Sequence, residues 1–237
     1  HQMTSCDLIV IGSGPAGKRA AIQAAKWGKS VYVIEERQSV GGVTVHTGTI
    51  PSKTLRETVL NLSGWRERAF YGRSYRVKDD ITAEDLKQRL DMTLTHEVDT
   101  LEHQFARNNV NIVCGYASFV DANTIQVQMA DGKEQTFVSN RILIATGTKP
   151  HRDESIPFDG EYIVDSDEIL GLKKVPGSLT VIGAGVIGVE YATIFSTLDV
   201  KVTLVEPRDS MLDFIDRELI EDFTHPTFLA FSSYAIS

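Results

Sequence analysis

The stretch that decides the fold runs from Leu8 to Glu35 and reads LIVIGSGPAGKRAAIQAAKWGKSVYVIE. The apolar run 8–11 is short and unbroken, which predicts a buried parallel strand, and residues 31–34 predict a second one. Between them an alanine-rich segment predicts a helix that ends near Trp27, where Gly28 can close it in the left-handed conformation. Strand, glycine turn, helix, strand and acid in this order are typical of a dinucleotide-binding βαβ unit.

Each part of this unit has a physical role. Gly12 allows the tight turn, Gly14 lets the backbone approach a pyrophosphate, and Gly17 lets the helix pack closely on the strand. The free N–H groups and positive dipole end of the helix favour phosphates. Glu35, 18 residues after Gly17, can accept hydrogen bonds from ribose hydroxyls.

The same pattern returns later in the chain. Residues 179–182 predict a strand, GAGVIG follows at 183–188, and a helix and a strand at 200–205 lead to Glu206. Glu206 again lies 18 residues after the last glycine, Gly188. Two copies at one internal spacing are more specific than one, and they predict two different nucleotides, one permanently held and one exchanging.

The composition is that of an ordinary globular chain. It has 237 residues, with 42% hydrophobic and 24% charged residues, and a net charge of −8 argues against a nucleic-acid surface. No apolar run approaches a membrane span of about 20 residues, and the polar N-terminus lacks the apolar core of a signal peptide. The two cysteines, Cys6 and Cys114, lie far apart, which suits a reducing cytoplasm.

Between the two glycine turns the pattern predicts a glycine-rich loop at 41–53, a helix from Ser52 to about Phe70, a polar linker at 71–82 and a second long helix. His96 and His103 are seven residues apart on that helix and are interpreted as solvated, so no metal site is predicted. Alternating residues then predict antiparallel strands at 112–120, 124–129 and 135–138, with a hairpin turn at Asp131-Gly132. A buried strand is predicted at 141–145.

These residues resemble the family of flavoproteins with two dinucleotide sites that includes dihydrolipoamide dehydrogenase, glutathione reductase and mercuric reductase. The resemblance runs from Cys6 to about Phe223 and rests on both glycine turns with their acids, the 41–53 loop and Ala145-Thr146-Gly147. Within the family the stretch GGVTVHTGTIPSKTLRE (41–57), supported by LSGWRER (62–68), is most similar to the soluble pyridine nucleotide transhydrogenase branch.

The resemblance implies an α/β fold: a Rossmann-like FAD-binding domain at 1–150 with an antiparallel β-meander insertion, then an incomplete Rossmann-like NAD(P)-binding domain at 151–224. The segment 225–237 no longer resembles the family and is expected to be a non-family tail. The missing remainder of the second domain is expected to leave a sheet edge exposed.

Two threonines stand where disulfide-reducing members carry cysteines. Their redox cysteines align with Thr44 and Thr49, and a hydroxyl group can form neither a disulfide nor a charge-transfer thiolate. The resemblance therefore implies FAD-dependent hydride transfer between NADPH and NAD without a redox disulfide. By the same resemblance Lys53, paired with Glu190, lies near flavin N5; the alternative is a solvated lysine and an exposed acid.

The predicted cofactor-binding residues are drawn from the two turns, their acids, the loop and the strand ends. They are Gly12, Gly14, Pro15, Ala16, Gly17, Glu35, Glu36, Gly42, Val43, Thr44, Ala117, Thr146, Gly147, Gly183, Gly185, Val186, Ile187, Gly188, Glu206 and Arg208. Ala117 would touch the adenine through its backbone, or it is simply a small strand residue.

The choice of nucleotide is partly readable at the second site. Glu206 suits the 2′-hydroxyl of NAD and should repel a 2′-phosphate, whereas Arg208 could accommodate that phosphate or be a surface residue. Acid and arginine together fit an enzyme that uses both NAD(H) and NADP(H).

The chain resembles roughly the N-terminal half of the family, so alternatives remain. It is either part of a cytoplasmic transhydrogenase that forms a homo-oligomer at full length, or an inactive nucleotide-binding or association fragment. A third alternative is a flavoprotein of the NADH oxidase or quinone reductase kind. Weak FAD retention is expected, because the family's later Gly-Asp flavin contact is missing.

Overall fold

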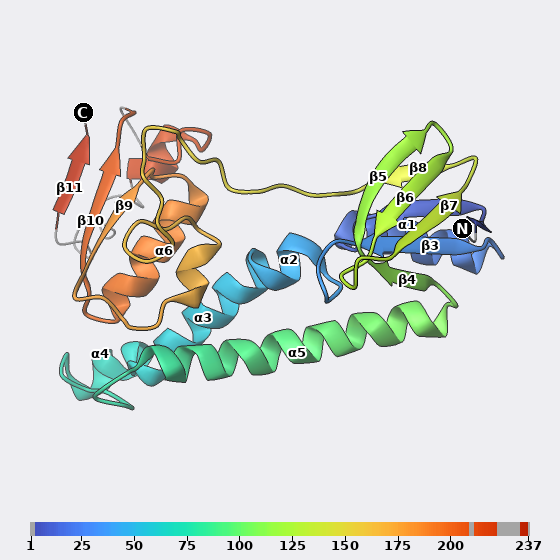
Figure 1. Ribbon diagram of the computed structural model, residues 1–237. Coiled ribbons are helices and arrows are strands. Elements are labelled where there is room, and N and C mark those ends of the chain that lie inside the picture. The colour runs from blue at the N-terminus through green and yellow to red at the C-terminus, as the bar shows by residue number, and fades with distance from the viewer. Residues whose placement is uncertain (1–2, 209–210, 222–232, 237) are drawn as a thin grey trace. The chain divides into compact units, whose positions relative to one another are not determined.

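The computed structural model describes residues 3–208, 211–221 and 233–236. The chain divides into two compact units, one made of residues 1–51 and 92–149 and the other of residues 52–91 and 150–237. The predicted domains, 1–150 and 151–224, differ from this division, because residues 52–91 group with the second unit. Figure 1 shows the elements of each unit.

The first unit contains two four-stranded sheets and the helix of the first glycine turn. One sheet is fully parallel, in the order β4-β3-β2-β8, and the other has the order β1-β7-β6-β5, with β1 parallel to β7 and the remaining pairs antiparallel. The elements are β1 (Met3–Ser5), β2 (Leu8–Ile11), α1 (Pro15–Lys26), β3 (Val31–Glu35), α2 (Gly42–His46), β4 (Asn111–Cys114), β5 (Tyr116–Asp121), β6 (Thr124–Gln128), β7 (Glu134–Val138) and β8 (Ile142–Ile144).

The second unit is built around the second glycine turn. Its sheet has the order β11-β10-β9 and is parallel throughout. Two helices, α3 and α5, begin in one unit and end in the other. The elements are α3 (Thr49–Leu62), η1 (Trp65–Glu67), α4 (Arg68–Tyr71), α5 (Ala83–Arg107), η2 (Glu168–Gly171), β9 (Ser178–Ile182), α6 (Val186–Thr197), β10 (Lys201–Glu206) and β11 (Ser233–Ile236).

Burial of the predicted apolar faces explains these elements. Val10, Val31 and Val33 are fully buried on the central strands of the first parallel sheet, where α1 packs against β2 and β3. Val202 and Leu204 have the same role on β10 beneath α6. Continuous apolar strands of this kind fit a parallel sheet that is covered by helices.

The structure confirms the local features of the sequence that set the two βαβ units. Gly28 follows the end of α1 with a φ angle of 75°, as its role in closing the helix requires. Gly132 has a φ angle of 81° in the turn between β6 and β7. Leu101 and Phe105 of the long helix α5 are buried in the core of the first unit.

Two predicted elements between residues 41 and 70 are wrong in their extent. The segment 41–53 is not a loop, because α2 occupies 42–46 and α3 begins at Thr49. The following helix does not reach Phe70; it ends at Leu62, and Gly64 then adopts a φ angle of 64°, which breaks the helix.

The predicted strand at 112–120 is in fact two strands of different sheets. β4 pairs in parallel with β3, whereas β5 pairs antiparallel with β6. The chain divides at Gly115, where a Cβ atom would lie 2.6 Å from the Cγ1 atom of Val127. The strand predicted at 141–145 is an edge strand of its sheet, β8, and Ile144 is exposed, so it is not a buried strand.

An exposed sheet edge was expected, and β9 ends this sheet, with β10 as its one strand partner among the described residues. β11 pairs in parallel with β10, from Thr203 opposite Ser233 to Glu206 opposite Ile236. Residues 225–232 and 237 of the predicted non-family tail lie outside the described residues.

Among the described helices none is both long enough and apolar enough to cross a membrane. The described residues also contain no group of three or more His, Cys, Asp and Glu side chains arranged to hold a metal ion.

Candidate nucleotide-binding sites

The first glycine turn is held tightly against the neighbouring backbone. Gly12 has a φ angle of 105°, and a Cβ atom there would lie 2.1 Å from the carbonyl oxygen of Ala145. At Gly17 a Cβ atom would lie 2.0 Å from the carbonyl oxygen of Gly12. Neither position can take a side chain without moving backbone, so both glycines are required by the packing of the turn itself.

Gly14 has a different environment. A Cβ atom there would meet only the Cα atom of Gly42, at 3.9 Å. Gly14 is the N-cap residue of α1, and no side chain caps this helix end. The first-turn N–H groups of Ala16 and Gly17 therefore suit an anion at this end of the helix, with Pro15 in the first turn, where a missing N–H costs nothing.

Glu35 lies at the end of β3 and is 5% exposed. Its Oε2 atom accepts hydrogen bonds from the backbone N–H of Ser13, at 3.0 Å, and from the Ser13 hydroxyl. Its Oε1 atom accepts the backbone N–H of Arg37 at 2.9 Å. Within the described part of the chain this leaves acceptor capacity on Oε1 for a ribose hydroxyl.

Ser13 is a site residue that the sequence reasoning missed. Besides donating to Glu35, its hydroxyl oxygen accepts the backbone N–H of Gly41 at 3.0 Å, so one buried side chain joins the turn, the acid and the start of α2. A serine between two glycines gives no signal of this in the sequence, because its partners are 22 and 28 residues away.

The structure brings other predicted residues of the first unit to the same turn. Gly42 packs on Gly14, and a Cβ atom at Gly147 would lie 3.7 Å from the Cγ2 atom of Val43. Thr146 and Gly147 follow β8 and are exposed, and Glu36 is exposed beside Glu35.

The remaining predicted residues of this unit have less direct evidence. Thr44 lies half-buried in α2, and Ala117 lies half-buried in β5. Thr47, in the same segment as Thr44, carries a buried Oγ1 atom with no hydrogen-bond partner in the described structure.

The second glycine turn repeats the first in its backbone. Gly183 has a φ angle of 103°, and a Cβ atom at Gly188 would lie 2.0 Å from the carbonyl oxygen of Gly183. Gly185 is the N-cap residue of α6, again without a side-chain cap. A Cβ atom at Gly183 or Gly185 would meet nothing within 4 Å.

The second turn is also open and apolar at its rim. Ile182, Val186 and Ile187 are 67%, 56% and 57% exposed, which is unusual for three neighbouring large apolar residues. An open backbone cradle with uncapped helical N–H groups and apolar walls fits a nucleotide, with phosphate at the helix and a ring against the apolar side chains.

Glu206 lies at the end of β10 and is 1% exposed. It accepts the backbone N–H of Ala184 at 2.7 Å, the contact that Ser13 makes with Glu35 in the first unit. The guanidinium of Arg208 also donates to it, through Nε and Nη2 at 2.9 Å each. These hydrogen bonds from Arg208, with the positive charge beside them, lower the pKa of Glu206 to about 2.

Lys53 and Glu190, predicted as a catalytic pair, are in contact within the second unit. The Nζ atom of Lys53 lies 2.5 Å from the Oε1 atom of Glu190. Glu190 belongs to α6 and its side chain is 15% exposed, whereas the Lys53 side chain, on α3, is 58% exposed. The carboxylate is thus partly buried and holds a lysine that solvent or a ligand can reach.

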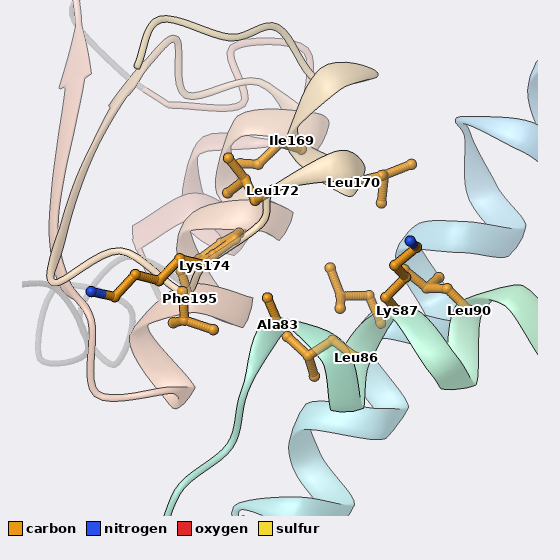
Figure 2. A pocket seen from close by; sticks show the side chains of 11 residues that line it. Ala83, Leu86, Lys87, Leu90, Ile169, Leu170, Leu172, Lys174 and Phe195 are labelled. Atoms are coloured by element: carbon orange, nitrogen blue, oxygen red, sulfur yellow. The ribbon is translucent and has the colours of Figure 1, made fainter. Parts of the chain in front are cut away.

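A small apolar cavity in the second unit is separate from these residues. It has a volume of about 30 Å³, close to that of one water molecule. Figure 2 shows Ala83 and Leu86 of α5 facing Ile169, Leu170 and Leu172 of the η2 segment. None of the predicted site residues lines it, and it is too small to hold a nucleotide.

Comparisons with known proteins show the family and the fold of this chain. The sequence matches the family described as pyridine nucleotide-disulphide oxidoreductase over residues 6–225. The chain belongs to this family. The predicted resemblance, from Cys6 to about Phe223, is therefore confirmed.

Relatives in the family include soluble pyridine nucleotide transhydrogenases. That of Mycobacterium tuberculosis is 52% identical over 220 residues, which make up 92% of this chain and 47% of the relative. That of Colwellia psychrerythraea is 39% identical over 219 residues, with the same coverage of both chains. The chain thus spans about half the length of the curated relatives it matches.

Solved structures of the family share the fold. The flavoprotein disulfide reductase RclA from Escherichia coli, in a Cu(II) complex, has a TM-score of 0.83 and 27% identity, covering 99% of this chain and 49% of that one. LpdA from Mycobacterium tuberculosis has a TM-score of 0.86 and 25% identity, covering 97% and 51%. The predicted α/β class with Rossmann-like sheets is confirmed.

Proposed function

We propose that this chain is the part of a flavoenzyme that carries its FAD turn and its NAD(P) turn, and that the enzyme transfers hydride between NADPH and NAD. The observation that carries the proposal is the pair of equivalent, uncapped helix ends, each beside a buried glutamate 22 residues from the N–H that it accepts. One chain with two such ends has a place for a resident dinucleotide and for an exchanging one.

FAD is assigned to the first turn. Gly14 and the first turn of α1 would hold the pyrophosphate, Glu35 the adenosine ribose, and the segment from Gly42 to Thr44 with Thr146 and Gly147 the rest of the cofactor. Held by these residues, a flavin would supply the hydride-transfer chemistry between two nicotinamides. The acceptor capacity of Glu35 supports this assignment.

The nicotinamide nucleotide is assigned to the second turn. Gly183, Gly185 and Gly188 form the cradle, and the first turn of α6, with Val186 and Ile187, faces the nucleotide. Glu190 orients Lys53, and the lysine charge would stabilise negative charge that develops on a ring beside it.

Threonines at 44 and 49 support hydride transfer over disulfide reduction. The described residues contain free cysteines only at positions 6 and 114, and neither is in the 41–53 segment. A thiol-disulfide step at this segment has no sulfur atom to use.

The test is the visible absorption spectrum of the purified chain with FAD added, before and after NADPH under nitrogen. The proposal expects a flavin band that NADPH bleaches and that NAD, or its thio analogue, restores. Bleaching without recovery on NAD, but with recovery on oxygen or quinone, would favour the oxidase or quinone reductase alternative. No flavin uptake at all would favour the association fragment.

A further inference from the structure

One peptide unit beside the first glycine turn is held from both sides. The carbonyl oxygen of Val40 lies 2.9 Å from the Nε2 atom of His46, the last residue of α2. Across the same peptide bond, the backbone N–H of Gly41 donates to the hydroxyl oxygen of Ser13 at 3.0 Å. A carbonyl oxygen can only accept a hydrogen bond, so the Nε2 atom of His46 carries the hydrogen.

These hydrogen bonds run in one direction and end on the acid of the turn. The His46 ring donates to the peptide, and the peptide donates to Ser13. The Ser13 hydroxyl then donates to the Oε2 atom of Glu35. Because each bond in such a chain polarises the next, the loss of one member weakens the others. The imidazole of α2 is thus connected to the acid at the end of β3.

The backbone next to this peptide packs on the turn itself. Gly41 and Gly42 have φ angles of 123° and 63°, which favour glycine. A Cβ atom at Gly42 would lie 2.8 Å from the Cα atom of Gly14, so the two glycine backbones are in close contact. The orientation of the 40–41 peptide is therefore set at the point where α2 meets the turn.

The His46 bond favours the peptide orientation that suits Glu35. If the peptide turned over, its carbonyl oxygen would take the Ser13 hydroxyl from Glu35, and the imidazole would have to change tautomer to accept the N–H. The second turn has no hydroxyl group at this position, because Ala184 stands there and contacts Glu206 through its backbone N–H. The chain of hydrogen bonds is specific to the first turn.

We propose that His46 is a positioning residue of the first site: through the 40–41 peptide and Ser13 it holds Glu35 in the orientation that accepts a ribose hydroxyl from the adenosine half of FAD. This rests on the proposed function, which assigns FAD to this turn. The Oε2 atom of Glu35 takes both Ser13 donors, so Ser13 fixes Oε1 as the oxygen with acceptor capacity left for the ribose.

The proposal predicts a loss of affinity that depends on the ribose. His46→Phe keeps a ring but removes the donor. We expect its affinity for FAD to fall about threefold to tenfold, the usual effect of a lost hydrogen bond. Its affinity for an FAD analogue that carries 2′,3′-dideoxyadenosine should change by less than about twofold, because this analogue offers Glu35 no hydroxyl group. His46→Gln retains an N–H donor and should restore most of the difference between the two ligands.

The experiment is equilibrium titration of the full chain with each ligand, followed by flavin fluorescence, with NAD in excess to occupy the second turn. In a Ser13→Ala background, His46→Phe should have no further effect, because residues that act through one another are not additive. His103→Phe, at an exposed position of α5, is the control and should bind both ligands as the parent chain does.

Amide hydrogen exchange at Gly41 is a second measurement, which needs no ligand. Exchange there should be faster in His46→Phe than in His46→Gln, with β3 unchanged in both. Unchanged exchange at Gly41, equal losses for FAD and its analogue, or a full effect in the Ser13→Ala background would overturn the inference while FAD binding stands. A parent chain that binds neither ligand overturns both the inference and the assignment of FAD to this turn.

Discussion

The two glycine turns of this chain have nearly the same backbone but hold their acids by different chemistry. The φ angle of the first glycine is 105° in one turn and 103° in the other. In both turns a Cβ atom on the third glycine would lie 2.0 Å from the carbonyl oxygen of the first. Glu35 is held by a neutral hydroxyl group, and Glu206 by a guanidinium. The two turns therefore share a backbone, whereas the side chain that holds the acid differs between them.

The two turns differ most in the space around their first glycines, Gly12 and Gly183. Gly12→Ala adds both a strained positive φ angle and a clash with the carbonyl oxygen of Ala145, whereas Gly183→Ala adds the strain alone. We expect a loss of about 4 kcal/mol for the first substitution and about 1–2 kcal/mol for the second. Native-state hydrogen exchange measures the opening free energy of each unit separately. Equal losses would show that the crowding at Gly12 is relieved by small shifts.

Removing the Ser13 hydroxyl group of the first turn should have the next largest effect. Ser13→Ala leaves the buried N–H of Gly41 unpaired and removes one donor from Glu35, so the first unit should lose about 1–3 kcal/mol. The second turn already has alanine at the equivalent position, Ala184, which is fully buried. Ala184→Ser is the matched reverse change. If Ser13→Ala leaves the opening free energy measured by hydrogen exchange at α2 unchanged, the hydroxyl group does not stabilise the first turn.

The helices that follow the two turns also differ in the residue two positions after the third glycine. Glu190, two residues after Gly188, holds Lys53, whereas Arg19, two residues after Gly17, is exposed. Lys53→Met should slow reduction by NADPH about tenfold, and Arg19→Gln should leave the rate unchanged. Stopped-flow reduction of FAD-loaded chain, at equal flavin content, measures this. Because Lys53 is largely exposed, its loss should change stability by less than about 1 kcal/mol.

The smallest expected effect is a pH dependence of the second unit. The folded pKa of Glu206 is about 2, below its usual value of 4.5, so the stabilisation is present above pH about 4.5 and is lost as the pH falls toward 2. With Arg208 half exposed, we expect a change of about 1 kcal/mol. Hydrogen exchange of β10 between these pH values measures how its opening free energy changes with pH. Glu206→Gln should remove most of this pH dependence. A slope that persists in the variant would belong to another carboxyl group.

Prediction from the sequence succeeded where the determining interactions are local. The glycine turns and the acids at their fixed spacing follow from backbone sterics within one βαβ unit. The 41–53 segment was misjudged because its glycines indicate a loop, whereas Gly41, with a φ angle of 123°, serves as the N-cap residue of α2. The break at Gly115 was missed because the apolar alternation continues through it, and only packing against Val127 reveals the change of sheet.

The candidate sites show the same limit. The pairing of Lys53 with Glu190 crosses 137 residues and came from a family resemblance, not from a spacing rule. Ser13 was missed because its partners are brought to it by the fold. Arg208 was noticed for its charge, but its hydrogen bonds to Glu206 and its contact with Asp213 depend on side-chain geometry that no sequence pattern encodes.

The pairing of β11 with β10 joins a segment outside the family match to a strand inside it. The family match ends at residue 225, yet the backbone of Ser233–Ile236 continues the sheet beside β10, with Ile236 opposite Glu206. Parallel pairing uses main-chain groups, so a stretch outside the family match can pair with the strand that carries the acid. We therefore expect changes that disrupt this pairing to lower the amide protection of β10, the strand that ends at Glu206.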